Sequence, residues 1–360
     1  MRGEGHAVTC YTVGFDNAAW GNVLSQLALP YRDVYFTLAY HQLHVVNGDC
    51  KVECMVLAEG GQTLMVPGMR APIPSDDASA FFDLQSCNGY GGPLASPSAS
   101  RDFLEQAWGE WQRRSAATGI VAGFFRLHPL LANECCLPES ARVILDRQTV
   151  FVDLADGPRA AWQRADARHR NMVNKGQREG LRVDWQDPTG WDDFELLYNE
   201  AMRRLNAPSA LRFSHAYFAG LRQLPGAALA CIRRGDALAA AAVFLFGPIW
   251  GHYHLSAHRE GSGNHLTNCL LQSALERCLD RGLRGLHLGG GRTSSPEDTL
   301  LKFKLGLGGR LLDFKVALVV ANLAHYRRLC DHWAQKTGVP PKWLLGYRQP
   351  KPPIAPLTSA

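Results

Sequence analysis

The chain has 360 residues, of which 46% are hydrophobic and 20% are charged, and its formal net charge is +5. This composition is typical of a globular protein and excludes a disordered or fibrous one. The length allows two domains with full hydrophobic cores. The basic excess is small, so it permits a phosphate-bearing partner without requiring one.

The ten cysteines are scattered and form no C-x-x-C pair, which argues against a disulfide framework and against a structural zinc site. Residues 1–12 lack the apolar segment of a secretory signal, and the most apolar run, residues 237–246, is too short to span a bilayer. We therefore expect a cytoplasmic protein with buried thiols and no transmembrane segment.

In the first part of the chain, residues 52–57 and 62–66 are apolar runs on either side of a Gly-Gly pair, which predicts a β-hairpin. Residues 88–93 hold three glycines and a proline, so they predict a loop. Apolar residues recur at helical spacing over 102–117, and Gly119 follows just past the end of that helix.

From about residue 149 the pattern alternates between strands and helices. We predict strands at 150–154, 228–232, 238–246, 250–257 and 283–288, and helices at 158–177, 191–206, 215–224, 265–281 and 323–336. The glycine-bearing loop 258–264 joins a strand to a helix, and backbone N–H groups at such a turn suit an anion. Prolines from residue 340 onward predict that order fades after about Tyr347.

Several motifs resemble those of the Fem-type aminoacyl transferases. Residues 168–175 (RHRNMVNK) are similar to the basic R-x-x-I-x-K-A helix of that family. Residues 286–291 (LHLGGG) and 302–309 (KFKLGLGG) resemble its late strand and its F-K-x-x-F-G signature. Residues 88–93 resemble its Tyr-Gly-Gly-Pro loop, and 252–256 its central strand. The resemblance covers most of residues 30–330.

The resemblance implies an α/β fold with two GNAT-like (acyl-CoA N-acyltransferase-like) domains, each with a mixed central sheet flanked by helices. The first would span 1–147 and be joined by a C-terminal helix within about 316–347. The second, 148–315, would hold the donor cleft, and 348–360 would be a proline-rich tail. The chain lacks the long helical hairpin that some Fem proteins carry, so it resembles the shorter FemX type.

The resemblance also implies transfer of an aminoacyl group from a charged tRNA to an amine, with no cofactor. The acceptor would be a small amine or a UDP-linked peptide, in cell-wall or antibiotic synthesis, and DNA would not be a partner. One alternative is an N-acyltransferase that uses acyl-CoA. Another is a binding protein without catalytic activity, which uses the cleft only for recognition.

Aminolysis of an ester is thermodynamically favourable and needs no ATP. The sequence accordingly contains no phosphate-binding G-x-x-x-x-G-K-[ST] loop. It needs alignment and a positive group near the developing oxyanion. The resemblance assigns that group to Lys304 and places Phe303 in the wall of the same site. The alternatives are a surface lysine and a core phenylalanine.

The basic helix offers candidate phosphate ligands. Arg164, Arg168, Lys175 and Arg178 fall in one stripe if residues 158–177 and the following turn are helical throughout. Arg170 lies off the stripe but inside the family motif, so it is the preferred diphosphate ligand. A solvated helix face explains the same charges equally well.

Other candidates lie in loops and strands. Gly261, Gly263 and Asn264 form a loose version of a GNAT pyrophosphate loop, or a plain turn before a helix. The resemblance places Tyr253 in the donor cleft, with a buried core tyrosine as the alternative. Tyr90 either contacts the acceptor from the first domain or packs under its own loop.

His252, His254 and His258 raise the question of a metal. Residues 252 and 254 point to the same face of a strand, but no acidic residue follows at ligand spacing, so we predict no metal site. No general base stands out in the sequence.

Overall fold

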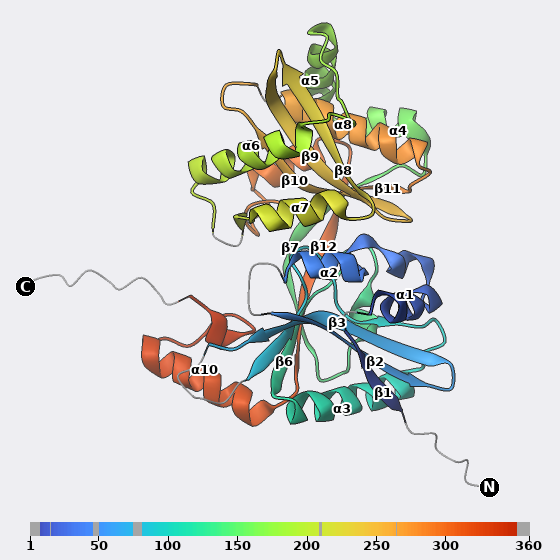
Figure 1. Cartoon of the computed structure of the whole chain (residues 1–360), viewed down its shortest axis with the longest axis vertical. Coiled ribbons are helices and arrows are strands. Elements are labelled where there is room, and N and C mark those ends of the chain that lie inside the picture. Colours follow the sequence, from blue (N-terminus) through green and yellow to red (C-terminus); the bar gives the residue numbers. More distant parts are fainter. Residues whose placement is uncertain are drawn as a thin grey trace, which may run out of the picture.

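The computed structural model describes residues 8–14, 16–45, 50–74, 81–208, 211–263 and 265–350. These residues form two lobes, which are joined by the long strands β7 (Arg142–Asp153) and β12 (Arg310–Val320) (Figure 1). The first lobe contains α1 (Asn17–Gln26), α2 (Leu38–Leu43), α3 (Arg101–Ala117) and α10 (Leu323–Thr337). The second contains α4 (Gly157–Arg164), α5 (Ala167–Arg178), α6 (Gly190–Arg204), α7 (His215–Gln223), α8 (His265–Asp280) and α9 (Thr299–Leu305).

One continuous sheet runs through both lobes in the order β1-β2-β3-β4-β6-β12-β7-β11-β10-β9-β8. The remaining strands are β1 (Thr9–Val13), β2 (Lys51–Glu59), β3 (Gln62–Pro72), β4 (Phe82–Gln85), β5 (Leu94–Ala95), β6 (Ile120–Arg126), β8 (Ala227–Arg234), β9 (Ala237–Phe246), β10 (Trp250–His258) and β11 (Gly285–Gly290); β5 pairs with β3 beside this path. The expected α/β architecture with helices on a mixed sheet is confirmed.

The predicted domain boundaries, 147/148 and 315/316, fall inside β7 and β12 rather than in linkers. Those two strands pair with each other in antiparallel fashion in the middle of the sheet. The halves are therefore hydrogen-bonded together, and the domain limits themselves stay a prediction.

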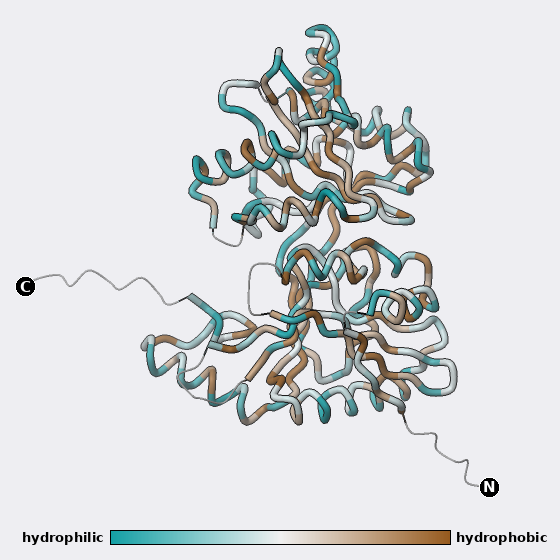
Figure 2. The backbone as a smooth tube through the Cα atoms, in the orientation of Figure 1, coloured by the Kyte–Doolittle hydropathy of each residue, from teal (hydrophilic) through white to brown (hydrophobic). Residues whose placement is uncertain are grey.

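The apolar run 237–246 is β9, which has both faces covered. Ala241, Val243 and Leu245 belong to the core cluster that includes α6 and α7, whereas Ala242 and Phe244 belong to the cluster that includes α8. Successive side chains of a strand point to opposite faces, so a strand covered on both sides has no polar positions. Figure 2 shows hydrophobic segments gathered along the strands and hydrophilic ones along the outer helices.

The helix predicted over 158–177 is wrong in one respect, because α4 ends at Arg164 and α5 starts at Ala167. Asp166 accepts a hydrogen bond from the His169 amide at 2.6 Å and so caps α5. Its own amide donates to the Gly306 carbonyl at 2.8 Å, which fixes the break against the end of α9. Arg164 and Arg168 therefore lie on two different helices, so the stripe of basic residues predicted from one continuous helix is wrong.

The other predicted helices and the 52–66 hairpin are confirmed within a few residues. Ser214 caps α7 as expected, with its hydroxyl accepting from the Tyr217 amide. At the C-terminal end, Tyr347 donates to the buried Asp83 carboxylate at 2.6 Å, and the rest of the predicted proline-rich tail, 351–360, lies outside the described residues. No helix among the described residues is long and apolar enough to cross a membrane.

Candidate active site

Strands β10 and β11 separate after a short parallel pairing. His252 pairs with His287, and in the described residues β10 continues beyond that point paired only with β9. Lys304 lies where the two strands part: its Nζ donates to the Gly290 carbonyl on β11 at 2.7 Å and lies 5.7 Å from the Tyr253 ring centroid on β10. The Lys304 ammonium thus lies between the two strands at the point where they separate.

Lys304 is almost completely buried, with 6% of its surface exposed. Burial lowers the pKa of its ammonium to about 8, although Asp298 opposes this shift. A lysine of this kind is mostly charged at pH 7 and lies close to the pH at which it releases its proton. It can therefore stabilise an oxyanion and donate a proton to a leaving oxygen.

Gly289 lies where side chains from the two halves of the molecule meet. A Cβ on this residue would lie 3.6 Å from Lys304 Nζ and 3.8 Å from the Tyr90 hydroxyl. Its φ of +71° is also one that other residues rarely adopt. Glycine therefore leaves open the space that Lys304 of the second half and Tyr90 of the first half both face.

Asp298 fixes the helix that carries Lys304. It caps α9 through the amides of Leu300 and Leu301, and it also accepts from the amides of Arg292 and Thr293. The hydrogen bond from Leu301, with those from the neighbouring groups, lowers the pKa of Asp298 to about 2. The turn between β11 and α9 is thus tied to the first turn of the helix.

Phe303 and Tyr253 are both half-buried and pack against the apolar cluster of the second lobe, and the Tyr253 ring lies 5.7 Å from Lys304 Nζ. A place for Phe303 in the wall of the site stays a prediction. Tyr253 also donates to the Ser256 hydroxyl. Tyr90 is buried, with ring contacts to Tyr35, His128, His287 and Phe314.

The basic residues of α5 lie away from this cluster or are engaged elsewhere. Arg170 donates to the carbonyls of Ala165 and Gln163 and so closes the α4–α5 turn. Lys175 pairs with Glu179 at 3.7 Å, and Arg168 is exposed. The structure thus gives Arg170 a structural partner, and a phosphate role for these residues stays a prediction.

The predicted donor loop is only partly described. Gly261 and Gly263 have φ values of +73° and +92°, and a Cβ on Gly263 would meet the His265 ring at 2.8 Å. Asn264 lies outside the described residues.

A buried polar cluster joins the lobes next to Lys304. Asp33, at the start of a short 3-10 turn (Val34–Phe36), lies 2.8 Å from His252 Nε2 and 3.8 Å from His128 Nε2. Burial alone would raise the pKa of Asp33, but His252, His128 and the Tyr35 amide outweigh burial, so that pKa is lowered. His287 lies beside the cluster, with its Nε2 3.0 Å from the Thr149 hydroxyl.

Asp33, His128 and His252 are close enough to be considered as metal ligands. The Leu130 amide donates to His128 Nδ1 at 3.3 Å, so this nitrogen acts as an acceptor, whereas Nε2 lies 3.8 Å from Asp33 and has no hydrogen-bond partner among the described residues. A metal-bound histidine instead leaves Nε2 bare and donates from Nδ1. Among the described residues, His252 Nδ1 has no acceptor either. His128 and His252 therefore lack the outer Nδ1 hydrogen bond to an acceptor that supports a metal-bound histidine.

The pairing of β10 with β9 shifts between Tyr253 and Leu255, so strict alternation does not hold at His254, and His252 and His254 have different partners. His254 Nε2 lies 2.8 Å from the Tyr217 hydroxyl, whereas His252 faces Asp33. His258 is exposed at the end of β10.

Asp33→Ala should destabilise the protein by about 3–5 kcal/mol, because removing one member of a buried pair leaves the other unpaired. Urea unfolding measures this loss directly. Asp236→Asn, in the exposed β8–β9 turn, is the control and should shift the midpoint by less than about 0.5 kcal/mol. Equal stability of the two variants would contradict this role for Asp33.

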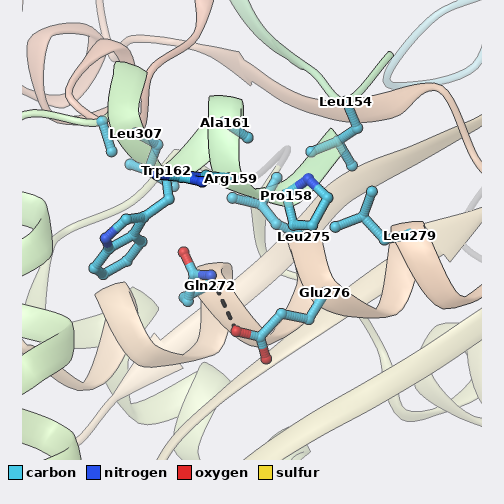
Figure 3. Close-up of a pocket in the computed structure, with 11 residues that line it drawn as sticks. Leu154, Pro158, Arg159, Ala161, Trp162, Gln272, Leu275, Glu276, Leu279 and Leu307 are labelled. Atoms are coloured by element: carbon cyan, nitrogen blue, oxygen red, sulfur yellow. Dashed lines mark hydrogen bonds between the residues drawn. The ribbon is translucent and has the colours of Figure 1, made fainter. Parts of the chain in front are cut away.

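A cavity of about 290 Å³ lies between α4 and α8 (Figure 3). Leu154, Pro158, Leu275 and Leu279 give it an apolar floor, and Gln272 and Glu276 are hydrogen-bonded along α8. None of the predicted site residues lines this cavity.

Residues 163–304, which include both α5 and Lys304, match the family model of the acetyltransferase (GNAT) domain. The chain is an acyltransferase with a GNAT domain. No curated protein matches the sequence significantly.

The fold is similar to that of several solved structures. FemX superposes with a TM-score of 0.67 at 10% identity, over 88% of this chain and 99% of that one. The C-terminal domain of a putative lysylphosphatidylglycerol synthetase from Agrobacterium fabrum gives 0.54 at 16% identity, over 86% and 94% of the two chains. L-PGS from Bacillus licheniformis gives 0.54 at 12% identity, over 83% and 90%. The Fem-type resemblance seen in the sequence is confirmed at the level of the fold.

Asp33, His128 and His287 were not predicted as a group. They come from three distant parts of the chain, and none lies in a motif that links it to the others. Asp298 was also missed, although an aspartate directly before an apolar helical segment is a recognisable N-cap signal.

Proposed function

We propose that the protein moves an aminoacyl group from aminoacyl-tRNA to an amine acceptor. The observation that carries the proposal is the buried Lys304 ammonium, which faces the same point as the Tyr90 hydroxyl of the other half. FemX and the lysylphosphatidylglycerol synthetases share this fold, and the name of the synthetases indicates attachment of a lysyl group.

In the proposed reaction, the neutral amine attacks the carbonyl carbon of the aminoacyl ester. A C–N bond forms, and the C–O bond to the ribose breaks. The amine loses one proton and the ribose oxygen gains one, so the reaction consumes no cofactor. Lys304 stabilises the oxyanion of the tetrahedral intermediate and supplies a proton to the leaving ribose oxygen, which it later regains.

Acyl-CoA is the competing donor, and the start of α8 argues against it. The Glu179 carboxylate of the segment after α5 lies 2.9 Å from the Nε2 of His265, the first residue of α8. This hydrogen bond lowers the pKa of Glu179, so the carboxylate is charged at neutral pH. A Cβ on Gly176 would come within 2.3 Å of Cys269 Sγ, so α5 packs directly on α8 there. Glu179 also pairs with Arg234 at 3.2 Å and with Lys175 at 3.7 Å, so these two cations at the helix end are engaged by Glu179 and do not stand free for a diphosphate.

A transfer assay with labelled, charged total tRNA and a pool of amines tests the proposal. We expect labelled amide product that is lost after RNase treatment, and no rise in melting temperature with coenzyme A. Consumption of acetyl-CoA together with thermal stabilisation by coenzyme A would support the other donor and overturn the proposal. A Glu179→Gln variant serves as a control, because it releases Arg234 and Lys175 from their ion pairs and should be the variant most prone to bind coenzyme A.

A further inference from the structure

Two adjacent cysteines lie in a short 3-10 turn of the first lobe, Asn133–Cys136, which we call the cysteine turn. The Sγ atoms of Cys135 and Cys136 are 3.9 Å apart. All ten cysteines lie within the described residues, and among them only Cys135 is exposed. Cys136 is buried, with 2% of its surface exposed. An accessible thiol thus lies beside a protected one, which is the arrangement of a reactive cysteine and its resolving cysteine.

The surroundings give the two thiols different roles. Burial, with a smaller contribution from Cys135, raises the pKa of the Cys136 thiol to about 12. Cys136 therefore stays protonated at neutral pH and does not react with an oxidant by itself. Solvent reaches Cys135, so a dissolved oxidant reacts there first. Cys136 is then the nearest thiol, held beside the oxidised sulfur by the chain itself.

A disulfide between the two neighbours requires the backbone to move. Neighbouring Cα atoms are about 3.8 Å apart across a trans peptide, whereas disulfides usually join Cα atoms about 4.4–6.8 Å apart. The Cys135 amide now donates to the Ala132 carbonyl at 3.2 Å, and the Cys136 carbonyl accepts from the buried Trp108 indole at 2.7 Å. Ala132 has a φ of +48°, which residues other than glycine rarely adopt. Closure of the disulfide therefore changes a turn that is already strained.

The cysteine turn also holds the loop that carries Tyr90. Asn133 is fully buried, and its side-chain amide donates to the carbonyls of Gly91 at 2.9 Å and Pro93 at 3.1 Å. Its Oδ1 accepts from the His128 amide at 3.1 Å. Tyr90 is the residue directly before Gly91, so one buried side chain connects the cysteine turn to the segment that positions Tyr90.

We propose that Cys135 and Cys136 form a redox-sensitive modification site. A hydroperoxide converts the pair to a vicinal disulfide, and closure weakens the hydrogen bonds by which Asn133 holds the Tyr90 loop (residues 88–93). Because the Tyr90 hydroxyl and Lys304 face the same space, oxidation of the cysteine turn changes the shape of the candidate active site. The modification itself does not depend on the transfer reaction.

The chemistry balances with hydrogen peroxide as the oxidant. The Cys135 sulfur attacks a peroxide oxygen, an S–O bond forms, the O–O bond breaks and one water leaves, which gives a sulfenic acid. The Cys136 sulfur then attacks the Cys135 sulfur, the S–S bond forms, the S–O bond breaks and a second water leaves. The two thiols lose two protons and two electrons, which reduce the peroxide to water. The strain in a vicinal disulfide makes it easy to reduce again with a dithiol.

Treatment of the full-length protein with hydrogen peroxide, followed by alkylation and peptide mass analysis, tests the site. We expect the peptide that contains both cysteines to lose about 2 Da and to escape alkylation, because two hydrogens leave when the disulfide forms. Dithiothreitol should restore the reduced mass. A gain of about 32 Da as a sulfinic acid, or a disulfide to a second chain, would overturn the proposal.

Hydrogen exchange measures the effect on the Tyr90 loop. The amides of residues 88–92 should exchange at least about fivefold faster in the oxidised protein, because loss of the Asn133 hydrogen bonds permits local opening. Dithiothreitol should return exchange to the rate of the untreated protein. A vicinal disulfide with unchanged exchange over 88–92 would overturn the coupling between the cysteine turn and the loop.

Cys135→Ser cannot form the disulfide, so its exchange over 88–92 should not respond to peroxide. Cys330→Ser, at a half-buried cysteine of α10, is the matched control and should respond as the wild type does. A response of wild-type size in Cys135→Ser would overturn the role of the pair. None of these measurements needs turnover, so a failure to transfer aminoacyl groups would count against the proposed function and leave this site standing.

Discussion

Lys304→Met lowers the turnover of aminoacyl transfer by at least about 100-fold, the usual effect of removing one oxyanion donor. Methionine has a similar length and no charge, so it fills the buried space while removing the ammonium that donates to Gly290. The measurement is the single-turnover rate with charged tRNA. Because a neutral side chain replaces a buried charge, the variant should remain at least as stable as the wild type.

Lys302→Met is the matched control, in the same helix. Lys302 is 54% exposed and pairs with Glu297 at the surface, so its loss should change turnover less than threefold. A Lys304→Met enzyme with wild-type turnover would contradict the role of the ammonium. A fall of the same size in both variants would indicate a general effect on α9.

The pH profile gives an independent check on Lys304. With a pKa of about 8, the ammonium is present below that pH and lost above it. Steps that need the ammonium should slow above about pH 8, even though the acceptor amine becomes more reactive there. The alkaline decline should disappear in the residual activity of Lys304→Met.

The second large effect is loss of stability in acid. Burial lowers the pKa of His41 to about 4 and that of His128 to about 3, and it lowers the pKa of His287 well below its usual value. Unfolded histidine binds a proton near pH 6.5, so the unfolded state binds more protons as the pH falls below that value. Each group then costs up to about 1.4 kcal/mol per pH unit between pH 6.5 and 4.

The combined cost for the three histidines approaches the whole free energy of unfolding of an ordinary domain. We therefore expect cooperative unfolding, as the pH is lowered, at a pH above 4. Asp33 acts in the same direction, because its pKa is lowered and its contribution is lost as the pH falls through that value. Circular dichroism against pH measures the midpoint. His215→Gln, at a histidine 82% exposed in its side chain, should leave the midpoint unchanged. Resistance of the wild type to pH 4 would show that these histidines are not held neutral.

Local patterns in the sequence predicted the elements well. The Gly-Gly hairpin, the helix that ends before Gly119 and the strand–loop–helix–strand series of the second half depend on neighbouring residues, and all are present. The failure at Asp166 has a tertiary cause as well as a local one. Its side chain offers a cap, but its amide is held by Gly306, 140 residues later, and helical periodicity does not reveal such a contact.

The motif around Lys304 identified the residue but not its environment. A lysine after a phenylalanine can be exposed or buried, and only packing of α9 against β7 and β11 lowers its pKa. Arg170 shows the opposite case, because a residue inside a family motif binds the carbonyls of its own turn.

The sequence by itself determined the type of each element and the resemblance to Fem-type transferases, because both depend on residues close together in the chain. Only the tertiary structure decided that the halves share one sheet, that Asp33 meets His252 across 219 positions, and that Asn133 holds the loop of residues 88–93. Strand pairing and buried polar contacts join distant segments, and their energies depend on burial and geometry that no local pattern contains.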